Sequence, residues 1–293
     1  MRIGIYLCSG LLLHSLAVNA QPAPETPEFP GARGGSFAAI DQVSGKLQKP
    51  AVAAAKMPAV VILHGSGGID GRGAFYAEAL NKAGFVTLEI FMFAPGARSR
   101  EGHESTLTHA YGALNYLASR SDINPNAIGA MGFSWGGNMA LKLASKKITT
   151  AFAASTGQTG FAALASFYPL CWQHSQAVTN TSHASYGAYA AFTGAPVMLF
   201  AGGKDDYGTP DECQKFVDAV APVAKELIRY QFYPDATHGW DAPPGRSRTI
   251  HDPSANQGKG GSVRMFPDSN IAADSRAKVM AFFQTHLKAG VQP

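Results

Sequence analysis

The 293-residue sequence has few charged residues, few cysteines and only one long apolar run. Charged residues make up 15% of the chain, below the usual quarter. The formal net charge of +4 is spread along the length and forms no basic patch. Beyond the first twenty residues, no segment resembles a transmembrane span. These absences argue against nucleic acid and against a membrane as partners of the mature protein.

The single long apolar run lies at the N-terminus. A short positive start is followed by residues 3–18, which are apolar but too few to cross a bilayer. Val18 and Ala20 place small residues before Gln21, as at a processing site. These features predict a secretory signal peptide, residues 1–20, cleaved after Ala20, and a secreted or periplasmic protein. A buried first helix is the alternative, but the proline-rich residues 21–24 argue against it.

The chain has three cysteines, and Cys8 would leave with the signal peptide. In an exported protein, the remaining Cys171 and Cys213 favour a disulfide over two free thiols, with a buried reduced pair as the alternative. Neither cysteine has a partner at metal-ligand spacing, so we expect no structural metal.

The rest of the chain reads as a leader followed by one domain. Residues 21–35 are rich in Pro, Gly and Ala and predict a mobile leader, and residues 36–293 predict a single α/β domain. Short apolar strands alternate with helical segments, which predicts a mostly parallel sheet with helices on both faces. The predicted strands include residues 60–63, 85–90, 127–131, 196–200 and 227–233, and a closing helix is predicted over 272–287. The long polar or Gly/Pro-rich segments 172–195 and 241–270 receive no structure or role.

The most informative motif is Gly132-Phe133-Ser134-Trp135-Gly136, between a predicted strand and a predicted helix over residues 137–147. A serine between two glycines at such a corner is typical of a nucleophile elbow. The sharp turn strains the serine backbone and leaves no room for side chains two positions away. Because the chain has 32 glycines, this pattern arises by chance in roughly one such sequence in four. Its context must therefore decide.

The context supplies a base and an acid in a suitable order. A serine hydroxyl needs a base to remove its proton, and the base needs a carboxylate to orient it. In α/β-hydrolases these residues follow the order Ser, Asp/Glu, His. Here Ser134 is followed by Asp205 and Asp206 after one predicted strand and by His238 after the next. All lie just past strand ends, where parallel sheets bind ligands, so they predict a catalytic triad.

The loop that carries the two aspartates leaves the choice of acid open. Asp205 lies nearer the strand end and is favoured, whereas Asp206 stays an alternative, and either could be a turn residue. The following Thr209-Pro210-Asp211-Glu212 predicts a helix start, with Thr209 as the cap and Pro210 as the first helical residue.

Two backbone N–H groups are predicted to hold the oxyanion. One belongs to Trp135, directly after the serine. The other comes from the glycine loop that follows the strand over residues 60–63, most simply from Ser66 or else from Gly67. His64 in the same loop is interpreted as structural.

Five motifs stand in order along the chain: His64–Gly68, Gly132–Gly137, Phe167–Cys171, Gly203–Pro210 with Cys213, and Tyr233–Gly239. Together they resemble the dienelactone hydrolase family of α/β-hydrolases over nearly all of residues 36–290. The resemblance implies an α/β-hydrolase fold and hydrolysis of esters or lactones through an acyl-enzyme. It implies Asp205 as the triad acid, through its place in a Gly-x-x-Asp motif. It also implies a disulfide between Cys171 and Cys213, which fall in matching positions within this branch.

The sequence departs from the founding members of that family. They use a cysteine where Ser134 stands, they hold a glutamate where Gly65 stands, and they carry an arginine shortly after the histidine that is missing here. Dienelactone itself is therefore not the expected substrate. Arg98 and Arg100 are candidates to contact an anionic group, although solvated arginines are the simpler interpretation. The three tryptophans, Trp135, Trp172 and Trp240, either line an aromatic acyl pocket or pack in the core.

These observations predict an exported serine hydrolase that cleaves a carboxylic ester or lactone without a cofactor. Ser134 attacks, His238 moves the proton and Asp205 orients His238. The alternatives are acyl transfer or peptide cleavage by the same triad, and a non-catalytic binding protein on the same fold. The expected partner is a small-molecule ester or lactone, bound by a monomer or small homo-oligomer. The sequence does not name the physiological substrate.

Overall fold

The computed structural model describes residues 21–35, 42–52, 54–93, 103–157 and 160–288. The predicted signal peptide, residues 1–20, and the two arginines Arg98 and Arg100 lie outside these ranges. Among the helices of the described residues, none has the length and apolar character needed to cross a membrane.

An eight-stranded sheet carries the site, in the spatial order β1-β2-β4-β3-β5-β6-β7-β8. Its strands are β1 (Glu28–Phe29), β2 (Val43–Gln48), β3 (Met57–Leu63), β4 (Val86–Ile90), β5 (Ile123–Phe133), β6 (Leu164–Phe167), β7 (Val197–Gly202) and β8 (Ile228–Tyr233). β1 and β2 run antiparallel to their neighbours, and all pairs from β4 to β8 are parallel. The prediction of a mostly parallel sheet is confirmed.

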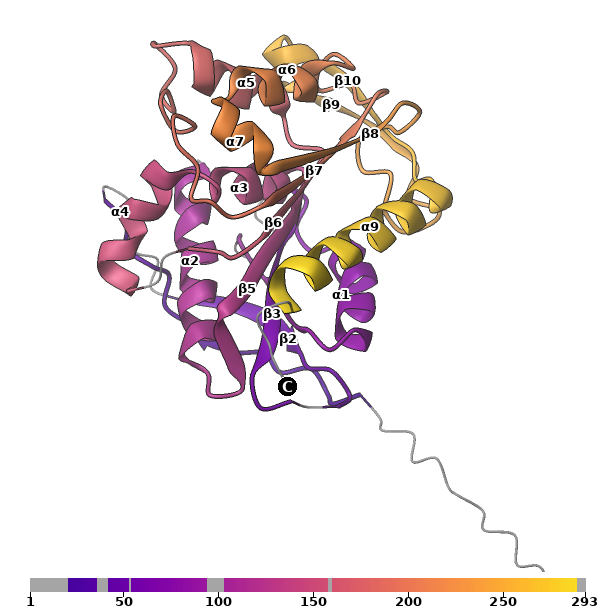
Figure 1. The fold of residues 1–293 in the computed structure, drawn as a ribbon. Coiled ribbons are helices and arrows are strands. Elements are labelled where there is room, and N and C mark those ends of the chain that lie inside the picture. The colour runs from indigo at the N-terminus through magenta and orange to yellow at the C-terminus, as the bar shows by residue number, and fades with distance from the viewer. Residues whose placement is uncertain (1–20, 36–41, 53, 94–102, 158–159, 289–293) are drawn as a thin grey trace, which may run out of the picture.

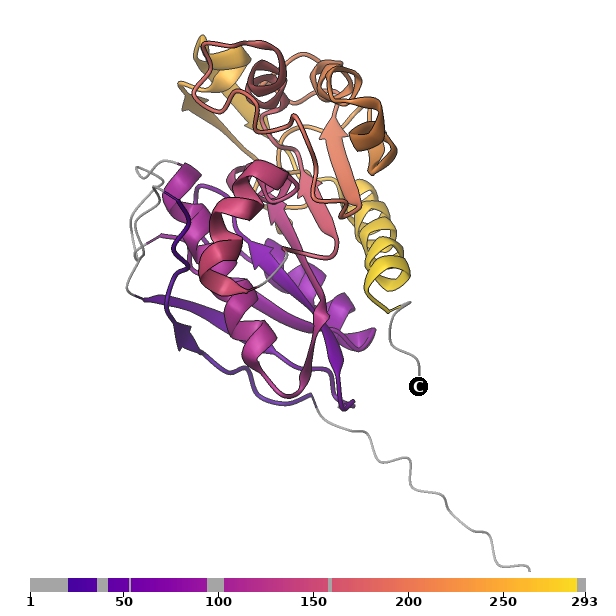
Figure 2. The same cartoon turned by 60° about the vertical axis from the view of Figure 1, so that its left-hand side comes forward.

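Helices cover both faces of this sheet, as the sequence predicts. The helices are α1 (Arg72–Lys82), α2 (His103–Ser119), α3 (Trp135–Lys142), α4 (Lys146–Thr156), α5 (Cys171–Thr179), α6 (Glu212–Ala219), α7 (Pro222–Glu226), α8 (Ala255–Gly258) and α9 (Ser269–Lys288). Figure 1 shows α1 and α9 on one face and α2 and α3 on the other, and Figure 2 shows the same layers from the side.

The strand side chains alternate between the two resulting cores. Val60 and Ile62 of β3 join the core under α1 and α9, and Val61 and Leu63 join the core under α2 and α3. Because both faces are covered, every residue of β3 is buried, which explains its uninterrupted apolar sequence.

The segments to which the sequence assigned no structure hold two short helices and a small hairpin. Residues 172–195 contain most of α5, and residues 241–270 contain β9 (Arg248–Asp252), α8 and β10 (Gly261–Met265). β9 and β10 form a separate two-stranded antiparallel sheet. In Figure 1 this hairpin lies beside α6, at the same end of the molecule as α5. Val263 and Ala255 of this unit pack against Leu170 and Tyr207, so the hairpin rests on the loops that follow β6 and β7.

Residues 21–35 lie against the domain. β1 pairs with β2, and Phe29 is buried and stacks on Tyr116 of α2 at a centroid distance of 4.9 Å. Ala32 donates its N–H to the carbonyl of Thr108. The packed core therefore includes residues before Ser36, where the sequence placed a leader, whereas the mobility of this segment stays a prediction.

Two predicted helix boundaries are wrong. The helix predicted over residues 137–147 ends at Lys142, and α4 begins separately after Ser145, whose hydroxyl caps the Ile148 N–H. The helix predicted to begin at Pro210 begins at Glu212. The N-cap residue is Asp211 rather than Thr209, and the Glu212 carboxylate accepts hydrogen bonds from the Thr209 hydroxyl and from the distant Gln257.

Candidate active site

The elbow places Ser134 at the corner between β5 and α3. Its backbone has φ 53° and ψ −107°, a conformation that a residue with a side chain rarely adopts. The flanking glycines are required by close backbone approach. A Cβ at Gly132 would lie 2.2 Å from the carbonyl oxygen of Gly136, and a Cβ at Gly136 would lie 2.1 Å from that of Leu63. The chain therefore needs glycine at both positions to raise Ser134 above the sheet.

Ser134, His238 and Asp205 form one line of hydrogen bonds. The Nε2 atom of His238 lies 2.8 Å from the Ser134 Oγ, and its Nδ1 atom lies 2.8 Å from the Asp205 Oδ2. Because an ionised carboxylate only accepts, Nδ1 carries the proton and Nε2 is left to accept the serine hydroxyl. The imidazole is almost fully buried. The three residues predicted from the sequence follow different strands, yet His238 lies between Ser134 and Asp205 and is hydrogen-bonded to both.

The neighbouring Asp206 points to a different partner. Both of its carboxylate oxygens bind the guanidinium of Arg264 on β10, at 2.6 and 2.9 Å, and one also accepts the Arg264 N–H. Burial raises the pKa of Asp206, but the hydrogen bonds and charge of Arg264 outweigh this effect and lower it. Of the two aspartates left open by the sequence, only Asp205 contacts His238.

Two tyrosines that the sequence analysis did not single out enclose His238. The rings of Tyr168 and Tyr207 lie 4.8 and 4.5 Å from the imidazole, both edge to face. The Tyr207 N–H binds Asp205, and its hydroxyl donates to Asp252 on β9. Both tyrosines stand inside the motifs Phe167–Cys171 and Gly203–Pro210, and this position is the signal that could have found them.

The glycine loop after β3 is held by His64. The Met92 N–H donates to the His64 Nε2 at 3.0 Å, so the Nδ1 must carry the proton that binds the Gly65 carbonyl at 2.7 Å. Burial lowers the pKa of His64 and favours this neutral form. With both ring nitrogens engaged, His64 fixes the loop that exposes Ser66.

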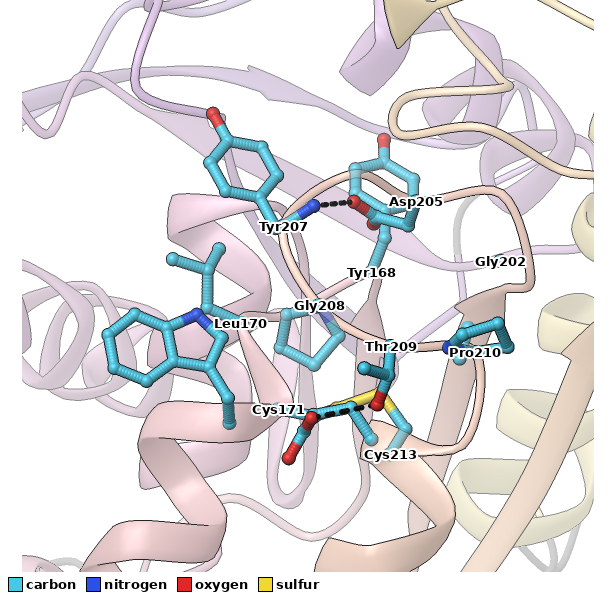
Figure 3. Close-up of a pocket in the computed structure, with 14 residues that line it drawn as sticks. Tyr168, Leu170, Cys171, Gly202, Asp205, Tyr207, Gly208, Thr209, Pro210 and Cys213 are labelled. Carbon is cyan, nitrogen blue, oxygen red and sulfur yellow. Dashed lines mark hydrogen bonds between the residues drawn. A yellow bond between two sulfur atoms is a disulfide. The ribbon is translucent and has the colours of Figure 1, made fainter. Parts of the chain in front are cut away.

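The predicted disulfide is present between Cys171 and Cys213, with the Cα atoms 4.9 Å apart. It joins the start of α5, after β6, to the first turn of α6, after the Asp205 loop. Figure 3 shows it beneath the loop that carries Asp205 and Tyr207. A small cavity of about 20 Å³ lies there, with Asp205 and Cys213 among its walls, and has room for about one water.

The three tryptophans divide between the core and the partly exposed surface. Trp240 is fully buried against Tyr168 and Tyr233, so it packs in the core. Trp135 and Trp172 are partly exposed. The Trp135 ring lies 5.8 Å from the ring of Phe93, edge to face.

The sequence pattern of the dienelactone hydrolase family matches residues 43–287. The chain belongs to this family. Two uncharacterized proteins of Mycobacterium tuberculosis, from strains CDC 1551 and H37Rv, are each 28% identical to it over 183 residues. That match covers 62% of this chain, and the chain spans 63% of the length of these relatives.

Solved structures share the fold of this dienelactone hydrolase family member. The apo form of Thermogutta terrifontis esterase 2 is 16% identical, covers 91% of this chain and 98% of its own, and gives a TM-score of 0.60. A dienelactone hydrolase-like promiscuous phosphotriesterase from metagenomic libraries is 16% identical, covers 88% and 98%, and gives a TM-score of 0.57. The predicted α/β-hydrolase fold is confirmed.

One departure from the founding members of the family has a local cause. A Cβ at Gly65 would lie 3.0 Å from the Nη2 of Arg72, so the guanidinium occupies the space beside this residue. Arg72 is itself buried and paired with Asp70 through hydrogen bonds of 2.7 to 3.1 Å. Any side chain at Gly65 would therefore approach this pair closely.

Proposed function

We propose that this protein hydrolyses a carboxylic ester or lactone through an acyl-enzyme on Ser134. The observation that carries the proposal is the unbroken Ser134–His238–Asp205 line, with 2.8 Å at both hydrogen bonds. Membership of the dienelactone hydrolase family supports the same class of reaction.

In the proposed first step, the Ser134 oxygen attacks the substrate carbonyl while the Nε2 of His238 takes its proton. Asp205 accepts the hydrogen bond from Nδ1 and stabilises the imidazolium that forms. The developing oxyanion is assigned to the N–H groups of Trp135 and Ser66. The imidazolium then gives its proton to the alkoxide, which departs as the alcohol or, for a lactone, stays attached as the hydroxyl end of the acyl chain.

In the second step, water attacks the acyl-enzyme. His238 removes a proton from the water and delivers it to the Ser134 oxygen as the ester bond to the enzyme breaks. The products are the free acid and the restored hydroxyl. The proposed residues need no metal or cofactor for either step.

We also propose that the protein acts in an oxidising compartment outside the cytoplasm. Two observations support this: the Cys171–Cys213 disulfide, and the signal-peptide pattern of residues 1–20.

The proposal is tested with a fluorophosphonate probe and a panel of p-nitrophenyl esters and lactones. Thermogutta terrifontis esterase 2 has been seen phosphorylated by paraoxon, so organophosphorus reagents suit this fold. We expect labelling of Ser134 and turnover of at least one ester, both abolished in Ser134→Ala. Equal labelling of Ser134→Ala, or no labelling and no turnover by the unmodified chain, contradicts the proposal. Adding alcohol or peptide acceptors to the assay separates hydrolysis from acyl transfer and peptide cleavage.

A further inference from the structure

A buried network of charged and hydroxyl groups lies behind His238 and takes no part in the proton transfers described above. Asp241 accepts the hydroxyl of Tyr168 at 2.5 Å and the hydroxyl of Tyr76 at 2.9 Å, one on each carboxylate oxygen. Arg72 donates to the same Tyr168 hydroxyl at 2.9 Å and pairs with Asp70. Burial raises the pKa of both tyrosines, so their hydroxyls remain protonated and donate to Asp241.

The network joins three segments that build the proposed site. Arg72 opens α1, directly after the loop that carries Ser66. Tyr168 follows β6, whose last residue, Phe167, accepts the N–H of Ser134 at 3.0 Å. Asp241 lies on the loop that carries His238. The Tyr168 hydroxyl is the point where all three segments meet.

The backbone of Tyr168 is held in a conformation that is unfavourable for a residue with a bulky side chain. Its φ is 38°, which lies in the left-handed region. Its N–H binds the Phe200 carbonyl at 2.8 Å, and its hydroxyl is fixed at the other end by Asp241 and Arg72. Between these anchors, the ring stands 4.8 Å from the imidazole of His238 and 4.7 Å from Trp240.

Stability alone does not account for such a network. Burying charge is costly, and replacing buried ion pairs with apolar side chains of similar size is often neutral or stabilising. Both carboxylate oxygens of Asp241 are nonetheless engaged, and Asp241 is almost fully buried. What the network supplies is a fixed distance between the Tyr168 hydroxyl and the His238 loop.

We propose that Tyr168 is a positioning residue, which Asp241 and Arg72 hold against His238 so that the imidazole stays aligned with both Ser134 and Asp205. This proposal rests on the proposed hydrolase function. Without its hydroxyl anchor the Tyr168 ring can shift, and the imidazole gains rotational freedom on that face. Small losses of alignment in a proton-transfer line reduce kcat, because the reacting atoms spend less time in the productive geometry.

Two tyrosines of the network give a matched test. Tyr168→Phe and Tyr76→Phe each delete one buried hydroxyl that binds Asp241, but only the Tyr168 ring contacts His238. We expect both variants to lose similar stability in urea denaturation. We expect Tyr168→Phe to lower kcat about tenfold with KM within about twofold, and Tyr76→Phe to leave kcat within about twofold. Active-site titration normalises the rates to folded enzyme.

A second test uses Arg72→Gln alone and together with Tyr168→Phe. The single variant does not depend on the folding of Tyr168→Phe. Arg72→Gln removes the other hydrogen bond to the Tyr168 hydroxyl and also the ion pair with Asp70, while the bond from Tyr168 to Asp241 remains. A smaller fall in kcat is expected, again without a change in KM. In the double variant with Tyr168→Phe, the combined fall in kcat should be less than the product of the two single falls, because the two residues share one contact.

Three outcomes are distinguishable. If the unmodified chain turns over esters and Tyr168→Phe behaves like Tyr76→Phe in kcat, the positioning proposal is overturned and the hydrolase proposal stands. Additive effects of Arg72→Gln and Tyr168→Phe on kcat also overturn it. If the unmodified chain neither labels nor turns over esters, the hydrolase proposal itself is wrong, and the positioning role falls with it.

Discussion

The two sides of the site are held by different means. The nucleophile side, from β5 into α3, is set by backbone packing at positions where no Cβ fits. The acid–histidine side, residues 205–265, is set by side chains from distant parts of the chain. Arg264 binds Asp206, Asp252 binds Tyr207, and a disulfide joins α5 to α6. The difference is that the serine is positioned by close backbone contacts, whereas its partners are held by side-chain contacts and a disulfide.

The largest expected effect is on kcat, and it distinguishes Asp205 from Asp206. We expect Asp205→Asn to lower kcat by about 10³ to 10⁴, because the amide favours the wrong tautomer of His238. Asp206→Asn loses only its pairing with Arg264, so its kcat should fall less than about fivefold. Steady-state kinetics on one ester measures both. A larger loss in Asp206→Asn would move the acid role to that residue.

The next effect tests the nucleophile side. A Cβ at Gly136 meets the backbone carbonyl of Leu63 and cannot be relieved by a rotamer change, so Gly136→Ala should cost more than about 3 kcal/mol of unfolding free energy. The control is Gly67→Ala, whose Cβ would meet no atom of the described residues within 4 Å and which should change stability by less than about 1 kcal/mol. Urea denaturation compares them. Similar stabilities would show that backbone crowding does not set the elbow.

A smaller effect tests the acid–histidine side. Replacing both Cys171 and Cys213 by serine removes a cross-link between residues 42 positions apart in the sequence. This change should cost about 2 to 3 kcal/mol of unfolding free energy. The comparison is between this variant and the unmodified oxidised protein in urea, with thiols counted under denaturing conditions. Two free thiols in the unmodified protein, or unchanged stability in the variant, would contradict the assigned role of the disulfide.

The same division decides what the sequence could predict. Local patterns such as glycine spacing and apolar runs predict the elbow and the parallel sheet. They also predict that the triad residues follow the ends of successive strands. The hairpin of β9 and β10 was not predicted, because its short strands are stabilised by contacts with Leu170 and Tyr207 rather than by their own pattern.

The choice between Asp205 and Asp206 depended on a residue far along the chain. No residue close to Asp206 in the sequence indicates that Arg264 forms an ion pair with its carboxylate. The Glu212 carboxylate at the start of α6 likewise binds Gln257, 45 residues away, and nothing near Glu212 indicates this contact. Contacts of this kind leave no periodic trace in the sequence.

The helix α9 carries a consequence for the order in which the molecule folds. It follows every other described element in the chain, yet Val279, Phe283 and Leu287 complete the core on the face shared with α1. Until α9 docks, the side chains of β3 and β5 on that face are covered only in part, on the side of α1. A chain emerging residue by residue would therefore hold a half-covered sheet until α9 appears, and that interval is when it is most exposed to aggregation.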